Sequence, residues 1–241
     1  MNAIGVFNLK GSPGATTLAL ALAAHARQQG AVLIEADAAG GDLALRFGIP
    51  QAPGLAQFAA RARQTGGRRE VLDGLVRTVG GDGMSPVELL PAPVEPAAVQ
   101  AAVSALAEAP DALTAAGRAH PLVLDLGRLA PQPPDVGLLA ACDTAVLVVR
   151  GDAVSLGHAR EAGWLQELPV RCGFVLVDTG PYRAAEAADV LGLPCLAPVP
   201  FGRRPLRGRG PTKALRGLWT VLTAPVAEPM PTPELVEVNG R

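Results

Sequence analysis

The sequence predicts an α/β protein with a doubly wound, mostly parallel sheet and helices on both of its faces. Three observations support this fold class: short apolar runs recur along the chain, helical patterns lie between them, and a Gly-rich turn follows the first run. Runs that are apolar on both faces are typical of buried parallel strands. Strands that alternate with helices favour right-handed crossovers. Sheets of this kind bind ligands at the carboxyl ends of their strands.

The expected strands are β-branched or Leu-rich and are bounded by turn residues. They span 3–8, 31–36, 87–90, 121–126, 144–149, 172–177 and 195–198. The helical patterns span 16–29, 42–47, 55–63, 70–76, 96–107, 155–165, 184–191 and 212–222. These elements predict one domain over residues 1–222. Residues 223–241 are Pro-rich, acidic and without periodicity, which predicts a flexible tail.

Composition narrows the function classes. The chain has 241 residues of which 49% are hydrophobic, enough to bury one sizeable core. The formal net charge of −1 disfavours a globally basic nucleic-acid binder. Apolar runs are far shorter than the roughly 20 residues that span a bilayer, and no signal peptide opens the chain, so we expect a cytoplasmic protein. Cys142, Cys172 and Cys195 are odd in number, which suits reduced thiols, and no Cys/His metal motif is present.

The segment "FNLKGSPGATT", residues 7–17, has the order of a phosphate-binding loop. Gly11 and Gly14 would let backbone N–H groups converge on phosphate oxygens, and the following helix would offer its positive N-terminal end. Thr16 falls where such loops place the hydroxyl that holds Mg²⁺. Ala15 stands where the loop lysine is expected, which removes a charge normally aimed at the β- and γ-phosphates. A Gly-rich turn that binds no ligand is the alternative interpretation.

The order K-G-S-P-G-A-T-T resembles the deviant Walker A motif of the ParA/MinD family, whose pattern is K-G-G-x-G-K-T-[T/S]. The resemblance implies ATP binding by Lys10, Gly11, Ser12, Pro13, Gly14, Ala15, Thr16 and Thr17. It also implies a catalytic role for Lys10, which in that family reaches the nucleotide of the partner across a sandwich dimer. The alanine at position 15 is similar to the atypical TadZ/CpaE branch of the family.

Two further segments resemble the family's acidic motifs. "VLIEADAAGGDLALRFGIP", residues 32–50, resembles its D-x-D-P-x-G-G-D-L segment, with Glu35 in place of the first acid and Asp37 as the second. The resemblance implies that Asp37 orients the attacking water, whereas Asp42 is expected to be a helix N-cap. "HPLVLDLGRL", residues 120–129, resembles a Walker B strand that ends in Asp125. Thr16, Asp37 and Asp125 are therefore the expected Mg²⁺ residues.

The later segments resemble the part of the family fold that binds the base. "RCGFVLVDTGPY" places Asp178, followed by Thr179, where an adenine-binding Asn is usual, and Asp accepts but cannot donate a hydrogen bond. "LPCLAPVPFG" places Pro200 and Phe201 as candidate backbone and stacking contacts. The resemblance covers residues 1–222.

A basic run without acids lies between residues 201 and 219. It contains Arg203, Arg204, Arg207, Arg209, Lys213 and Arg216. Three interpretations stay open: a solvated loop and helix start, a non-specific DNA surface, or an arginine that compensates for the charge lost at Ala15. Trp219 is expected in the core, and no amphipathic membrane helix is present in the acidic, Pro-rich end of the chain.

The resemblance as a whole implies an ATP- and Mg²⁺-dependent dimerisation switch that positions or assembles cellular machinery through a protein partner. The missing loop lysine predicts weak or absent hydrolysis. Two alternatives belong to different classes: a pseudo-ATPase adaptor that binds a protein partner without nucleotide, and a non-specific DNA-associated partition protein.

Overall fold

The computed structural model describes residues 3–65, 69–81, 84–129, 135–177, 180–199 and 209–224. Its centre is a sheet of eight strands in the order β3-β4-β2-β5-β1-β6-β7-β8. Every pairing is parallel except that of β3 with β4. The strands are β1 Ala3–Asn8, β2 Val32–Glu35, β3 Arg77–Gly81, β4 Met84–Leu90, β5 Leu122–Arg128, β6 Thr144–Arg150, β7 Arg171–Val177 and β8 Cys195–Val199. The predicted doubly wound fold class is confirmed.

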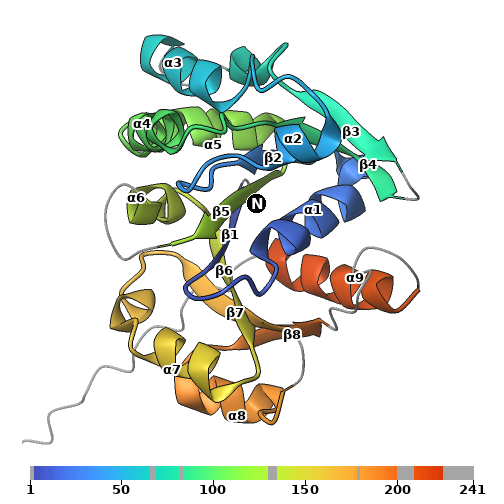
Figure 1. Cartoon of the computed structure of the whole chain (residues 1–241), viewed down its shortest axis with the longest axis vertical. Helices are drawn as coiled ribbons and strands as arrows, with labels where there is room; N and C mark the ends of the chain where they lie inside the picture. Colours follow the sequence, from blue (N-terminus) through green and yellow to red (C-terminus); the bar gives the residue numbers. More distant parts are fainter. Residues whose placement is uncertain are drawn as a thin grey trace, which may run out of the picture.

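Helices cover both faces of the sheet (Figure 1). One layer contains α1 Ala15–His25, α2 Leu43–Phe47 and α9 Arg209–Thr223, and we call this side the α1 face. The opposite layer contains α3 Leu55–Thr65, α4 Pro96–Ala107, α5 Pro110–Ala119, α6 Asp135–Ala140, α7 Ala153–Arg160 and α8 Ala184–Leu191. Short 3-10 turns span Arg27–Gln29, Arg69–Leu72 and Gly163–Gln166. In the part of the chain that the structure describes, no helix has the length and apolarity to cross a membrane.

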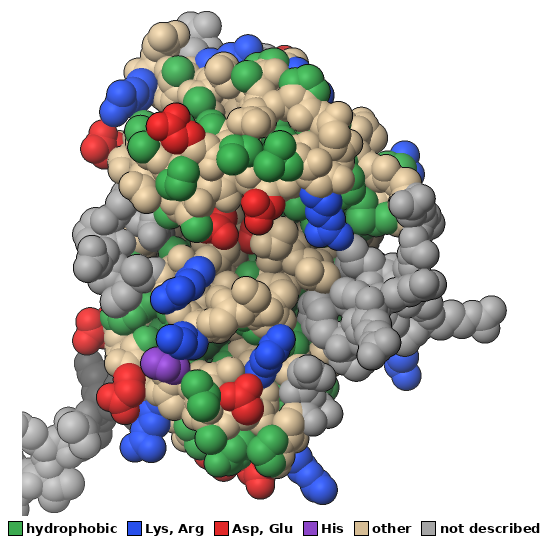
Figure 2. All heavy atoms as spheres, in the orientation of Figure 1, with side chains coloured by type: hydrophobic (Ala, Val, Ile, Leu, Met, Phe, Trp, Pro, Cys, Tyr) green, Lys and Arg blue, Asp and Glu red, His purple; other side chains and the backbone are tan. Residues whose placement is uncertain are grey.

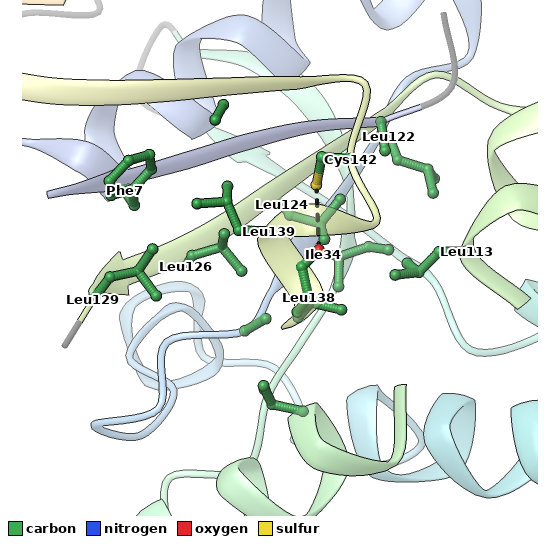
Figure 3. Close-up of a cluster of buried hydrophobic side chains, with 14 of the residues drawn as sticks. Phe7, Ile34, Leu113, Leu122, Leu124, Leu126, Leu129, Leu138, Leu139 and Cys142 are labelled. Atoms are coloured by element: carbon green, nitrogen blue, oxygen red, sulfur yellow. Dashed lines mark hydrogen bonds between the residues drawn. The ribbon is translucent and has the colours of Figure 1, made fainter. Parts of the chain in front are cut away.

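Two hydrophobic cores lie on the two faces of the sheet, and neighbouring strand residues alternate between them except near Gly127. In β1, Val6 packs on the α1 face, whereas Phe7 packs on the opposite face (Figure 3). The opposite-face core includes Cys142, whose Sγ donates to the Leu138 carbonyl over 3.6 Å, and burial raises the pKa of this thiol to about 12. All three cysteines are free, as the sequence indicates. Trp219 lies in the core of the α1 face, and its Nε1 donates to Gln29 Oε1 over 3.2 Å.

Several elements differ from the expectation. Strand β3 was not predicted because only Val79 among its residues is buried, as befits a polar strand at the sheet edge. Helices α5 and α6 were also missed, and the helix expected over 70–76 is a 3-10 turn of four residues. The helix expected to reach residue 29 ends at His25 and continues as a 3-10 turn. Thr223 belongs to α9, and residues 225–241 of the expected tail lie outside the described residues.

Glu35 at the end of β2 holds the connection between β2 and α2. Its Oε1 accepts hydrogen bonds from the backbone N–H groups of Asp42 (2.7 Å) and Leu43 (2.8 Å), and its Oε2 accepts one from Ala92 N (3.0 Å). Asp42 does occupy the N-cap position of α2, but its own side chain makes no capping bond. The start of α2 is therefore capped by a buried carboxylate from the neighbouring strand.

We predict that Glu35→Ala lowers the free energy of unfolding by about 3 kcal/mol, because it leaves buried N–H groups without an acceptor. Urea unfolding would measure the change. Glu95→Ala is the matched control, since Glu95 is exposed and makes no side-chain capping bond. Equal stabilities of the two variants would contradict a capping role for Glu35.

Candidate functional site

The connection between β1 and α1 has the backbone of an anion-binding loop. Gly11 and Gly14 have φ angles of 69° and 105°, which side-chain-bearing residues rarely adopt. Asn8 stabilises the loop, since its Nδ2 donates a hydrogen bond to the Gly11 carbonyl over 3.0 Å. The N-terminus of α1 has no side-chain cap and no acid in its first turn. Its first N–H groups are therefore available to an anion at the carboxyl edge of the sheet.

The predicted loop residues differ in how they face this opening. Lys10, Gly11 and Ser12 are exposed, Gly14, Thr16 and Thr17 are half-buried, and Pro13 is buried. Ala15 is only 4% exposed and packs in the core of the α1 face. The methyl group that replaces the loop lysine therefore points into protein, and only the backbone N–H of Ala15 can serve a ligand.

Thr16, Asp37 and Asp125 come together beside the loop. Asp125 is 1% exposed, receives a side-chain hydrogen bond from Thr16, and accepts one from Gly127 N over 3.2 Å. Asp37 is half-buried and its Oδ1 accepts from Ala39 N over 2.9 Å. A Cβ added to Gly127, whose φ is 56°, would lie 1.9 Å from Asp37 Oδ2. Gly127 thus lets the two carboxylates approach each other.

The site concentrates negative charge in a buried setting. The pKa of Asp125 is raised to about 7. Burial is the largest cause, the hydrogen bonds from Thr16 and Gly127 oppose the shift, and the charges of Asp37 and Glu35 add to it. Burial likewise raises the pKa of Asp37. A bound cation would stabilise the ionised form of both carboxyl groups.

The residues present fit Mg²⁺ bound together with phosphate. Mg²⁺ in proteins usually takes one or two carboxylates and keeps waters and phosphate oxygens as its other ligands. Thr16, Asp37 and Asp125 offer such a set of oxygen atoms next to the first N–H groups of α1. Within the described ranges, no three His, Cys, Asp or Glu side chains form a cage that could hold an ion by themselves.

The remaining candidates lie elsewhere. Asp178, Thr179, Pro200 and Phe201 lie outside the described residues, so the expected base-binding contacts stay predictions. Of the basic run, Arg203, Arg204 and Arg207 also lie outside them, and the side chain of Arg209 is not described. Lys213 and Arg216 are exposed on α9.

Sequence reasoning missed two residues that shape the site, Asn8 and Gly127. Asn8 is polar but only 5% exposed. A polar residue at the end of an apolar strand is visible in the sequence and could have indicated a residue that supports the loop. Gly127 follows Asp125 by two residues, but its contact with Asp37 joins segments 90 residues apart in the chain. That proximity follows from the pairing of β2 with β5.

Asp125 makes the stability of the ligand-free chain depend on pH. Its pKa of about 7 in the folded chain exceeds the ordinary value of 3.8, so between these values the folded state binds more protons than the unfolded state. The contribution of Asp125 to stability therefore falls as pH rises through this window. We predict that the free energy of unfolding of Asp125→Asn, measured relative to wild type, rises by about 2 to 4 kcal/mol as the pH increases from 4 to 8.

Urea unfolding across this pH range would measure the difference between the two curves. Asp111→Asn, which changes an exposed acid at the start of α5, is the control. If the free energies of unfolding of wild type and Asp125→Asn depend on pH in the same way, the pKa of Asp125 is not raised in the folded chain.

Known proteins resemble this chain in structure but not detectably in sequence. No protein-family model and no curated protein sequence matches the chain. Among solved structures, MinD of Pyrococcus furiosus has 20% identity and a TM-score of 0.70, with 92% of this chain and 98% of that one covered. MinD of Pyrococcus horikoshii with Mg-ADP has 19% identity and a TM-score of 0.70, over 92% and 96% of the two chains.

A ParA family ATPase from Chlorobium tepidum has 20% identity and a TM-score of 0.65, over 92% of this chain and 90% of that one. The similarity extends over nearly the whole length of each protein. The strand order, the loop between β1 and α1 and these similarities together show that this chain has the fold of the MinD and ParA ATPases.

Proposed function

We propose that this chain is a cytoplasmic, nucleotide-binding dimerisation switch of the MinD/ParA kind, which binds ATP with Mg²⁺ and hydrolyses it weakly or not at all. The observation that carries the proposal is the uncapped start of α1, where a Gly-rich loop adjoins Thr16, Asp37 and Asp125. The switch would position or assemble cellular machinery: at a septum, as for the septum site-determining MinD neighbour, or in chromosome or plasmid partition or pilus assembly, as the sequence resemblance implies.

Each group at the site has a distinct role in this proposal. The first N–H groups of α1 would bind phosphate oxygens, and the Thr16 hydroxyl and the Asp125 carboxylate would hold Mg²⁺ with its water ligands. Asp37, half-buried beside Asp125, orients a water for attack on the γ-phosphate. Bound Mg²⁺ would neutralise phosphate charge and the acids around it. The MinD neighbour from Pyrococcus horikoshii holds Mg-ADP, which supports this assignment.

Weak turnover follows from the composition of the loop. Ala15 is turned into the core and provides no charge for the γ-phosphate. Lys10 is exposed at the mouth of the loop and is available to a second copy of the chain. We therefore assign Lys10 to the nucleotide of the partner in a homodimer. A further protein partner would bind the chain in one nucleotide state and not in the other.

Two other functions have specific support and are separated by experiment. A pseudo-ATPase adaptor is favoured by the buried Ala15, and DNA association is favoured by Lys213 and Arg216, which are exposed on α9. Calorimetric titration with ATP, with and without Mg²⁺, distinguishes the switch from the adaptor. Salt-dependent binding to arbitrary duplex identifies the DNA-associated protein.

We predict that wild type binds Mg-ATP and that Thr16→Ala binds it about tenfold more weakly, since one charge-assisted contact is lost. Isothermal titration would measure both affinities. Thr220→Ala, which changes an exposed threonine on α9, should bind like wild type. Equal affinities of wild type and Thr16→Ala would exclude the loop as the binding site.

We predict that Lys10→Ala abolishes ATP-promoted dimerisation and leaves thermal stability nearly unchanged, because a contact worth about 1.5 to 3 kcal/mol is lost only in the dimer. Lys10→Arg should rescue dimerisation poorly, since a planar guanidinium differs from a compact ammonium. Sedimentation with ATP, with ADP and without nucleotide would test this. Lys213→Ala, at the only other lysine of the chain, is the control. Matching association states of wild type and Lys10→Ala in all three conditions would rule out the dimer.

A further inference from the structure

Two exposed arginines end the strands on either side of β1. Arg128 is the last residue of β5 and Arg150 is the last residue of β6, and in the sheet β1 lies between these two strands. Both side chains are exposed at the carboxyl edge from which the loop to α1 departs. On this side of the molecule, Figure 2 shows Lys and Arg side chains over the region of β1 and β6, with acidic side chains just above them. Neither arginine was among the residues predicted from sequence.

Arg150 belongs to the same side of the sheet as α1. Val146 and Val148 pack in the α1-face core, and Ala145, Leu147 and Val149 pack in the opposite one. Strand β6 stays paired with β7 up to the pair Arg150–Val177, so the alternation continues to its last residue. Arg150 therefore lies on the α1 face, one strand away from the loop.

Arg128 reaches the same face because of the turn at Gly127. Leu126 and Leu129 both pack in the opposite-face core although they are three residues apart (Figure 3). A regular strand would place them on different faces, and the φ of 56° at Gly127 is the irregularity that accounts for the difference. Arg128, directly before Leu129, is left on the α1 face. It is in register with Asn8, the residue that braces the loop.

Cations from outside the loop would improve the charge balance of the site for a polyphosphate. Glu35, Asp37 and Asp125 would repel a polyphosphate, and Ala15 contributes no charge to oppose them. Within the described residues, the Arg128 side chain has no ion-pair partner. The charge of Arg150 acts on Asp152, but that carboxylate already accepts hydrogen bonds from Ser155 N (2.8 Å) and Ser155 Oγ (3.0 Å) as the cap of α7.

We propose that Arg128 and Arg150 form a two-arginine clamp that binds the phosphates of a nucleoside triphosphate and supplies the positive charge that the loop lacks at Ala15. The proposal rests on the proposed function, because it takes the loop as the phosphate site. A guanidinium offers parallel N–H donors that match phosphate oxygens, so two arginines on flanking strands suit a chain of phosphates lying across β1. The proposal also assigns the compensating charge to the ends of β5 and β6 rather than to the basic run between residues 201 and 219.

The test measures binding of tripolyphosphate, ATP and ADP by calorimetry, in the full chain at fixed ionic strength. We expect Arg128→Gln and Arg150→Gln each to weaken ATP and tripolyphosphate binding about tenfold, and the double variant about a hundredfold. Binding of ADP should weaken less. Arg128→Lys and Arg150→Lys should recover part of the affinity because they keep the charge. Arg118→Gln and Arg160→Gln, at exposed arginines near the ends of α5 and α7, should bind like wild type.

The outcomes separate this inference from the function on which it rests. If wild type binds ATP and both Gln variants bind it within twofold of wild type, the clamp is overturned and the proposed function stands. If wild type binds neither ATP nor tripolyphosphate, both are overturned. Loss of affinity equal to that of Arg118→Gln and Arg160→Gln would show a general charge effect and would also overturn the clamp. Thermal unfolding of each variant verifies that it is folded.

Discussion

Burial of carboxylates at the carboxyl edge of β2 and β5 is the constraint on which the rest of this structure depends. Glu35 and Asp125 are 2% and 1% exposed, and each is compensated by backbone N–H groups or by the Thr16 hydroxyl. Buried charge is costly unless it is hydrogen-bonded, so the segments that provide these donors have little freedom. The start of α2, the turn at Gly127 and the first turn of α1 are therefore all positioned by acids.

The two buried acids differ in how completely they are compensated. Glu35 accepts three backbone hydrogen bonds and ties β2 to α2 and to the residues after β4, which makes it a structural group. Asp125 lies closer to the loop, has fewer donors, and has a pKa raised to about 7. An incompletely compensated acid beside an uncapped helix start is an arrangement that a cation and an anion can complete together. At the same edge of the sheet, Glu35 therefore stabilises the fold, whereas Asp125 belongs to the candidate site.

The loop between β1 and α1 has a backbone suited to phosphate, but no lysine side chain at position 15. Gly11 and Gly14 keep the positive φ angles, and Asn8 keeps the loop braced, while Ala15 has become part of the core. In the proposed function, affinity for phosphate would come from N–H groups and from cations carried by other elements. Lys10 in the loop, and Arg128 and Arg150 at the ends of the two strands beside β1, are exposed cations at this edge of the sheet.

The sequence by itself determined the fold class and most of the strands, because apolar runs of strand length between helical patterns leave few other arrangements. It also indicated the loop and Asp125, whose signals are local in the chain. It missed β3, α5 and α6, where edge position or short length weakens the pattern. Only the tertiary structure decided that Asp37 meets Gly127, that Glu35 caps α2, and that Arg128 and Arg150 flank β1. These contacts join residues far apart in the chain through the strand order, which side-chain periodicity along a single segment does not encode.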